Sequence, residues 1–270
     1  MKTVLFCGGL GTRIRDYAEN IPKPMIPIGG KPILWHLMSY YGQYGHKDFI
    51  LCLGYKANVI KEFFLNYQPH VYADCIVSGS GNNVETLGDP QQDWRVTMID
   101  TGVWRNIGER LLAVRRHVEG EDIFLANYSD GLSDVDLPAM IETFERSGKI
   151  AAFVAARPTF SLHLVEMNAE GRVSGICATK EADLWINGGG FIFRPQIFDY
   201  LRDGEELVEE PFQRLIEDDQ LLAFKHDGFW RPMDTLKDKE VLEDLVEQGR
   251  MPWQIGGAAS ANPANVRKAG

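Results

Sequence analysis

Residues 3–13 read Thr-Val-Leu-Phe-Cys-Gly-Gly-Leu-Gly-Thr-Arg and residues 22–25 read Pro-Lys-Pro-Met, and these two segments are the most informative part of the sequence. The apolar run at residues 3–7 predicts a buried strand that opens directly into a glycine-rich loop. Glycines carry no Cβ, so the backbone N–H groups of such a loop can approach an anion closely. Arg13 and Lys23 add two positive charges beside it. The stretch therefore predicts a phosphate-binding site.

Two common phosphate loops do not match this stretch. A Walker A loop requires a Gly-Lys-Ser/Thr ending that is absent here. A dinucleotide fingerprint requires a third glycine where Ile14 stands, which disfavours an NAD-dependent sugar dehydrogenase. A glycine-rich turn with a purely structural role remains the plain alternative, but it would require neither Arg13 nor Lys23. Pro22 and Pro24 restrain the backbone around Lys23, because each proline ring fixes φ, and this favours a positioned charge.

These residues resemble the signature of the sugar-phosphate nucleotidylyltransferases. Further stretches narrow the resemblance to the glucose-1-phosphate cytidylyltransferase branch, over about the whole chain to Trp253. They are Gly-Gly-Lys-Pro-Ile-Leu-Trp-His at 29–36, Val-Thr-Met-Ile-Asp-Thr-Gly at 96–102, Ile-Asn-Gly-Gly at 186–189 and Gly-Phe-Trp-Arg-Pro-Met-Asp-Thr-Leu at 228–236. The last stretch points to the cytidylyl branch.

The resemblance implies a reaction in which a sugar 1-phosphate attacks the α-phosphorus of a nucleoside triphosphate, with glucose 1-phosphate and CTP as the first expectation. Arg13 and Lys23 are the implied catalytic cations. Mg²⁺ is implied between Asp130, which follows the strand expected at 122–127, and Asp234, which arrives from a distant segment. The implied nucleotide-binding residues are Gly8, Gly9, Gly11, Thr12, Arg13, Arg110 and Ser129, the last replacing the usual first glycine of a Gly-Asp-Gly motif.

The acceptor side departs from the pattern of the relatives. Asn187 and Gly188 fit the implied sugar-binding strand, since an asparagine side chain both donates and accepts hydrogen bonds. The Glu-Lys-Pro motif of many relatives is Cys177-Ala178-Thr179 here, with Lys180 nearby, and His163 stands in place of a glycine. We therefore assign His163 and Lys180 to the acceptor site as well, and a different nucleotide or a non-glucose, sugar-like phosphate stays open.

The order of the elements predicts an α/β fold with a Rossmann-like, mostly parallel central sheet and helices on both faces. Strands are expected at 49–53, 94–100, 122–127, 150–156, 162–167, 172–177, 185–193 and 221–224, and helices at 31–45, 58–67, 108–118, 137–147 and 237–248. We expect one domain over residues 1–255, with a nucleotide-binding half (1–148) and a β-rich acceptor-binding half (149–255). Residues 256–270 are rich in Ala, Gly, Asn and Pro and are expected to form a disordered tail.

Composition sets further bounds. A net charge of −10 disfavours a nucleic-acid partner, and no apolar run is long enough to span a membrane. The four cysteines are scattered without a Cys-x-x-Cys pair, which is typical of reduced thiols in a cytoplasmic protein. The resemblance implies a homo-oligomer. An alternative of another class is a catalytically weak subunit that binds a nucleotide sugar, although binding alone would not require both Asp130 and Asp234.

Overall fold

The central sheet grows from strand β1 (Lys2–Phe6), which pairs in parallel with β4 (Asp48–Leu53) and with β8 (Phe124–Tyr128). The computed structural model of the chain describes residues 1–9, 21–72, 74–81, 83–86, 93–159 and 162–255. Within them, eight strands form one sheet in the order β13-β10-β14-β8-β1-β4-β7, with β15 beside β10. The other strands of this sheet are β7 (Arg95–Asp100), β10 (Ala151–Ala156), β13 (Ile186–Asn187), β14 (Phe191–Phe193) and β15 (Leu221–His226).

The strand directions confirm the predicted sheet type. The pairs β8-β1, β1-β4 and β4-β7 are parallel, as is β10-β15, whereas β14 runs antiparallel to both β8 and β10. The sheet is therefore mixed and mostly parallel. The carboxyl ends of β1 and β8 meet at one edge, which is where ligands of open α/β sheets bind. The sheet includes strands from both expected halves of the chain, whose division stays a prediction.

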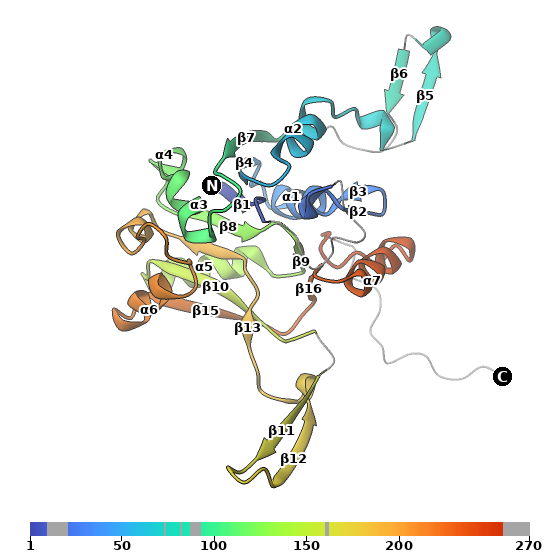
Figure 1. The fold of residues 1–270 in the computed structure, drawn as a ribbon. Helices are drawn as coiled ribbons and strands as arrows, with labels where there is room; N and C mark the ends of the chain where they lie inside the picture. Colours follow the sequence, from blue (N-terminus) through green and yellow to red (C-terminus); the bar gives the residue numbers. More distant parts are fainter. Residues whose placement is uncertain (10–20, 73, 82, 87–92, 160–161, 256–270) are drawn as a thin grey trace, which may run out of the picture.

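Helices cover both faces of the sheet, as predicted (Figure 1). Successive side chains of a strand point to opposite faces, so Leu5 joins a core cluster with α1 while Val4 and Phe6 join another with α3. Full burial of each such apolar side chain contributes on the order of 1.5–3 kcal/mol. The helices are α1 (Ile33–Gln43), α2 (Ala57–Leu65), α3 (Ile107–Ala113), α4 (Arg115–Val118), α5 (Leu137–Ser147), α6 (Glu210–Glu217) and α7 (Leu236–Glu247).

Four small two-stranded sheets complete the described fold. They are β2 (Pro27–Ile28) with β3 (Lys31–Pro32), β5 (Cys75–Ser78) with β6 (Asn83–Thr86), β9 (Gly131–Ser133) with β16 (Trp230–Pro232), and β11 (His163–Met167) with β12 (Val173–Ala178). The pairs β5–β6 and β11–β12 project from the body on different sides, and we call them the two arms (Figure 1). The pair β9–β16 belongs to the body and leads into α7.

The structure corrects three details of the predicted elements. The strand expected at 185–193 is divided into β13 and β14, because Gly189 and Gly190 have φ values of +75° and +58° that end a regular strand. The helix expected at 108–118 is interrupted at Val114, which has non-helical ψ near 5°. The β5–β6 arm was not predicted from the sequence.

Two other expectations concern the chain as a whole. None of the helices in the described ranges combines the length and apolarity required to cross a bilayer. The tail expected to be disordered, residues 256–270, lies outside the described residues.

Candidate functional site

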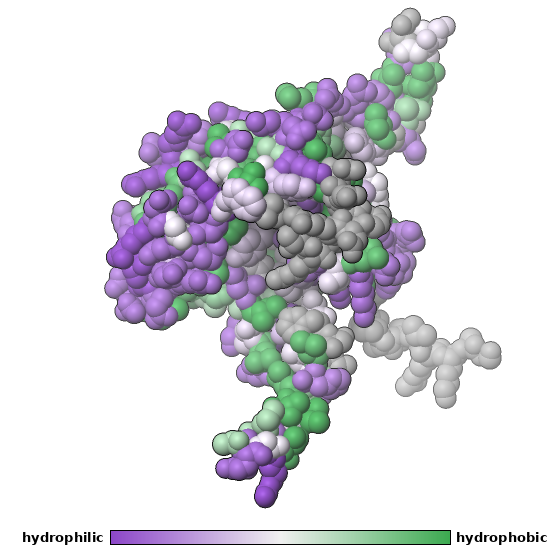
Figure 2. Space-filling model, in the orientation of Figure 1, coloured by the Kyte–Doolittle hydropathy of each residue, from purple (hydrophilic) through white to green (hydrophobic). Residues whose placement is uncertain are grey.

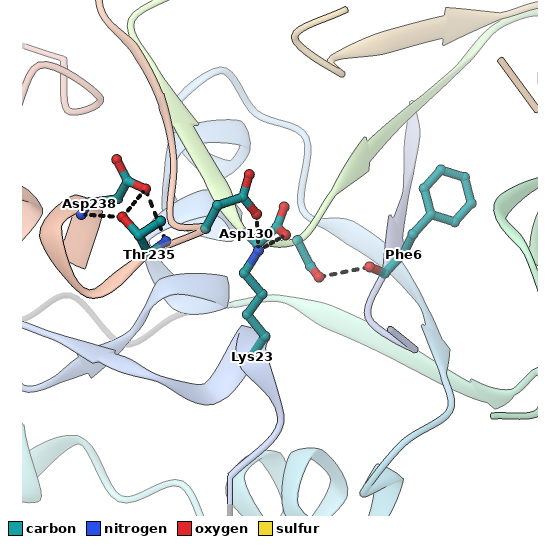
Figure 3. A network of polar contacts seen from close by, with 7 residues as sticks. Phe6, Lys23, Asp130, Thr235 and Asp238 are labelled. Carbon is teal, nitrogen blue, oxygen red and sulfur yellow. Dashed lines mark hydrogen bonds and ion pairs between the residues drawn. The ribbon is translucent and has the colours of Figure 1, made fainter. Parts of the chain in front are cut away.

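The site forms at the carboxyl edge of the sheet, where three charged side chains from distant segments converge (Figure 3). The Lys23 Nζ donates to Asp130 Oδ2 at 2.6 Å and to Asp234 Oδ1 at 2.6 Å. The lysine is separated from these aspartates by 107 and 211 residues in the sequence. The predicted catalytic lysine and the two predicted metal-binding carboxylates are thus brought together by the fold.

Lys23 is presented by a stiff turn. It begins a short 3-10 helix, η2 (Lys23–Met25), in which Met25 N donates to Pro22 O at 2.8 Å and Ile26 N donates to Lys23 O at 3.1 Å. Pro24 and Met25 are buried and anchor the turn to the core. Since the flanking prolines fix φ, the Lys23 backbone has little freedom, and only its side chain can move appreciably.

The β9–β16 pair positions the two carboxylates. Asp130 directly precedes β9 and Asp234 closely follows β16, and the antiparallel register places Pro232 opposite Gly131. The backbone bond from Met233 N to Asp130 O, 2.7 Å long, extends this pairing to the site. Asp234 in turn precedes Thr235, the N-cap of α7, whose side chain accepts from Asp238 N. Each carboxylate is therefore held at the end of a paired strand.

The electrostatics of Lys23 are set by burial and by its two partners. Its side chain is 12% exposed, while those of Asp130 and Asp234 are 30% and 36% exposed. Burial alone would lower the pKa of Lys23, but Asp130 and Asp234 outweigh it and hold this pKa above its ordinary value. Lys23 is therefore a cation at neutral pH.

The donor set of the two aspartates fits a divalent cation. One ammonium nitrogen touches an oxygen of each carboxylate, so these oxygens are close enough for a single cation to contact both. Within the described residues no group of three or more His, Cys, Asp or Glu side chains could hold a metal. Two carboxylates completed by water and substrate phosphates are the arrangement that Mg²⁺ commonly takes, whereas a structural zinc site requires four protein ligands.

Arg110 lies beneath the start of the glycine-rich loop. The residue is 2% exposed, and its guanidinium donates to Gly8 O at 3.1 Å, Leu53 O at 3.2 Å, Val103 O at 3.2 Å and Thr101 Oγ1 at 2.8 Å. Burial lowers the pKa of Arg110, although a guanidinium remains charged at neutral pH. The role of Arg110 in nucleotide binding stays a prediction, and in this structure its donors serve the protein backbone and the Thr101 hydroxyl.

This contact orients the loop. The Gly8 carbonyl is held towards Arg110, and in a planar trans peptide the following N–H points the opposite way. The Gly9 N–H is therefore directed away from Arg110, and Gly9 itself is exposed. A Cβ on Gly8 would lie 1.8 Å from Arg110 Nη1, so only glycine fits there, whereas a Cβ on Gly9 would meet no atom of the described residues within 4 Å. The contact of Gly8 and Gly9 with a nucleotide phosphate stays a prediction.

Ser129 and Cys7 fasten the strands behind the site. The Ser129 hydroxyl is buried and donates to Phe6 O at 2.7 Å, which ties the end of β8 to β1 (Figure 3). Burial raises the pKa of the Cys7 thiol to about 12, so Cys7 stays protonated and is no nucleophile. The predicted contact of Ser129 with a nucleotide stays a prediction.

The acceptor residues Asn187 and Gly188 are attached to the same end of β8. Asn187 Nδ2 donates to the Tyr128 hydroxyl at 3.3 Å, and Tyr128 is two residues before Asp130. Trp230 Nε1 donates to Gly188 O at 2.8 Å, and a Cβ on Gly188 would lie 2.9 Å from that nitrogen. These bonds connect the predicted acceptor strand to both elements that carry the aspartates.

The other two predicted acceptor residues lie at the base of the β11–β12 arm. His163 is exposed and pairs with Ala178 at the start of β11, and Lys180 belongs to the short 3-10 helix η5 (Thr179–Glu181). Thr179 is buried, and its hydroxyl donates to Leu162 O while accepting from Leu162 N. The position that departs from the relatives therefore fastens the arm, and the roles of His163 and Lys180 stay predictions.

Part of the prediction lies outside the described residues, namely Gly11, Thr12 and Arg13. Sequence reasoning also missed some contacts. Asp136 caps α5, whereas Asp134 Oδ1 contacts His226 Nε2 at 2.9 Å. Asn127 Oδ1 accepts from Gly190 N at 2.8 Å, which sets the turn after the acceptor residues. No local sequence signal reveals such partners, because each pair joins distant segments.

Comparison with known proteins places these features in a family context. The family model "Nucleotidyl transferase" matches residues 2–238. The chain is 41% identical to glucose-1-phosphate cytidylyltransferase of Salmonella typhimurium over 256 residues, covering 94% of this chain and 99% of that protein. It is 26% identical to mannose-1-phosphate guanyltransferase of Gibberella zeae, covering 88% of this chain and 62% of that protein. The crystal structure of HddC from Yersinia pseudotuberculosis shares the fold with a TM-score of 0.63 at 20% identity, covering 91% of this chain and 99% of that one.

Proposed function

Because the chain belongs to the nucleotidyl transferase family, and to its glucose-1-phosphate cytidylyltransferase branch, we propose that it transfers the cytidylyl group of CTP to glucose 1-phosphate. The products are CDP-glucose and pyrophosphate. The observation that carries the proposal is the position of Lys23 between Asp130 and Asp234 in a chain that aligns with almost the whole of a cytidylyltransferase. A subunit that only bound a nucleotide sugar would not require this arrangement.

The reaction requires positioned positive charge and no general base. A phosphate monoester has its second pKa near ~6, so the attacking oxygen is already mostly ionised at neutral pH. It forms a bond to the α-phosphorus while the bond from that phosphorus to the bridging oxygen of pyrophosphate breaks in line. Lys23 provides positive charge for the attacking phosphate and the α-phosphate, and the outward-directed Gly9 N–H provides a hydrogen-bond donor at the loop. In the proposed mechanism Arg13 neutralises the departing pyrophosphate.

Members of this family commonly use a divalent metal, and we assign Mg²⁺ to Asp130 and Asp234. When bound there, the ion would neutralise phosphate charge and stabilise the charge that develops at the α-phosphorus. Two carboxylate ligands from the chain are sufficient for this ion, since Mg²⁺ commonly retains several waters. The proposed cytoplasmic location agrees with four unpaired cysteines, two of which are buried in the core.

One observation favours an acceptor other than glucose 1-phosphate as the second candidate. An open pocket lies beside Asn187, and Phe153, Trp185, Phe212 and Lys225 contribute to its walls. Because the usual Glu-Lys-Pro stretch is also replaced, this pocket could accept a sugar-like phosphate with a larger or less polar substituent. The chemistry at the α-phosphorus would be the same, since the phosphate-facing residues are unchanged.

The two arms support the proposal of a homo-oligomer. An isolated two-stranded hairpin is marginally stable in water, and exposed apolar side chains indicate a surface that a partner covers. Figure 2 shows hydrophobic residues gathered along both arms. The apolar residues of the arms that are at least 43% exposed are Ile76, Val77, Val84, Val165, Met167, Val173 and Ile176. Sedimentation equilibrium should give a mass of two or more times 30.4 kDa, and the mass of a single chain at all concentrations would contradict this.

The activity is tested by pyrophosphate release with Mg²⁺. Each of the four ribonucleoside triphosphates is crossed with a panel of sugar 1-phosphates that includes glucose 1-phosphate. Turnover confined to CTP and glucose 1-phosphate supports the proposal, and turnover with another sugar phosphate supports the second candidate. Lys23→Met is the matched control, which should lose activity by orders of magnitude while keeping the native circular dichroism spectrum. Absence of turnover with every pair would contradict both candidates.

A further inference from the structure

The position of Lys23 raises a conflict between two roles at one place. The ammonium is 2.6 Å from one oxygen of Asp130 and 2.6 Å from one oxygen of Asp234. Mg²⁺ lies about 2.0–2.1 Å from its oxygen ligands. A cation bound to the same two oxygens would therefore lie in the space that the Lys23 Nζ occupies. The two cations would also repel each other strongly at such short range.

From this conflict we propose that Lys23 is an internal counter-cation that exchanges with the divalent metal. In the metal-free enzyme its ammonium bridges the two carboxylates, and when the metal is bound it leaves them and becomes available to substrate phosphate. The inference rests on the proposed function, because it assumes that Asp130 and Asp234 are the metal ligands. It adds an ordered event, in which the catalytic lysine is released only where the metal is present.

The structure gives Lys23 the means to make this movement. Its backbone is fixed by η2 and by the prolines on either side, so the turn does not have to rearrange. The lysine side chain is a flexible four-carbon stem that carries a compact charge, and its Nζ can shift by several ångströms about a fixed Cα. The Asp130 and Asp234 side chains are about a third exposed, so an ion from solvent can reach them while Lys23 is in place.

The Lys23 ammonium also neutralises the two carboxylates in the metal-free enzyme. Two carboxylates held this close repel each other, and each would be costly to leave without a compensating charge. The β9–β16 register and the bond from Met233 N to Asp130 O fix them at their positions regardless of what lies between them. Lys23 therefore offsets the repulsion between the two fixed carboxylates before the metal arrives, at the expense of metal affinity.

Metal binding in the absence of nucleotide tests the exchange. Mn²⁺ affinity is measured by the loss of the free-ion electron paramagnetic resonance signal for the wild-type chain, Lys23→Met, Lys23→Arg and Asp130→Asn. We expect Lys23→Met to bind Mn²⁺ at least about tenfold more tightly than the wild type, because the competing charge is gone. Lys23→Arg keeps the charge and should stay close to the wild type, and Asp130→Asn should bind more weakly. Equal or weaker binding by Lys23→Met would overturn the proposal.

A second measurement uses the wild-type chain and needs no variant to fold. Lys23 is labelled with an amine-acylating reagent, and the extent of labelling at this residue is read by peptide mass spectrometry with and without Mg²⁺. Release from the carboxylates should increase labelling several-fold, whereas the exposed Lys47, which pairs with Asp93, serves as an internal control that should not change. Unchanged or reduced labelling of Lys23 would contradict the exchange. Neither readout depends on turnover, so failure of the exchange leaves the pyrophosphate-release result intact, and the reverse also holds.

Discussion

The packing beneath the glycine-rich loop predicts a large difference between two neighbouring substitutions, Gly8→Ala and Gly9→Ala. A Cβ on Gly8 would lie 1.8 Å from Arg110 Nη1 and 2.3 Å from Arg110 Cζ, so the whole guanidinium would have to move. A Cβ on Gly9 would meet nothing within 4 Å in the part of the chain that the structure describes. Neither glycine has a positive φ, so backbone strain does not enter the comparison.

The magnitude follows from what holds Arg110 in place. Inserting a methyl group into a packed core costs about 1–3 kcal/mol. Moving the guanidinium breaks at least one of its four hydrogen bonds, and each bond to a charged group is worth about 1.5–3 kcal/mol. We therefore expect Gly8→Ala to lower the free energy of unfolding by roughly 2.5–6 kcal/mol. Gly9→Ala should change it by less than about 1 kcal/mol.

Equilibrium unfolding in urea, followed by tryptophan fluorescence and by circular dichroism, measures both values. Adding Arg110→Met removes the clashing group, so Gly8→Ala should cost much less in that background, and the double-mutant cycle should be strongly non-additive. Gly9→Ala has a second readout, because an added Cβ should block the proposed approach of phosphate to Gly9 and impair turnover without loss of stability. A difference of less than about 1 kcal/mol in stability between Gly8→Ala and Gly9→Ala would mean that Arg110 yields easily to a Cβ at residue 8, and would refute its role as a rigid support of the loop.

Three further predictions concern groups outside the loop. Burial lowers the pKa of His226, but its ion pair with Asp134 outweighs this effect and holds the pKa above its ordinary value. The pair therefore stabilises the fold below about pH 6.5, and this contribution is lost as pH rises through the raised pKa of His226. His226→Gln should flatten this part of a profile of melting temperature against pH. Burial lowers the pKa of His36, whose Nδ1 accepts from Trp253 Nε1 at 3.3 Å. Protonation of His36 should therefore cost stability as pH falls below about 6.5, and His36→Gln should remove this acid-side decline in melting temperature. A wild-type profile with no such decline, or a decline that His36→Gln leaves in place, would contradict this. Asn106 forms a capping box at the start of α3, and Asn106→Ala should lower the free energy of unfolding by about 1 kcal/mol in urea titrations, with no change expected if the cap were unimportant.

The local features of the fold could be predicted from the order of the amino acids alone. A strand opening into Gly8 and Gly9 is readable because apolar β-formers and glycines have local conformational preferences. The restraint on Lys23 is readable for the same reason, since Pro22 and Pro24 act on the adjacent backbone. The alternation of strands and helices predicted a parallel sheet and hence the edge at which ligands bind. These inferences needed only neighbours in the chain.

Contacts between distant groups, and the charge and burial of those groups, depend on the folded chain. Lys23 bridges Asp130 and Asp234 because η2 and the β9–β16 pair are folded against the same edge, a contact across 107 and 211 residues that no local preference encodes. Arg110 turned out to lie inward beneath Gly8, where four oxygen acceptors compensate the guanidinium for its loss of water. The break between β13 and β14 and the projection of the arms likewise depend on packing partners. Long-range pairing is set by the complementarity of whole surfaces, and that information appears only when the chain is folded.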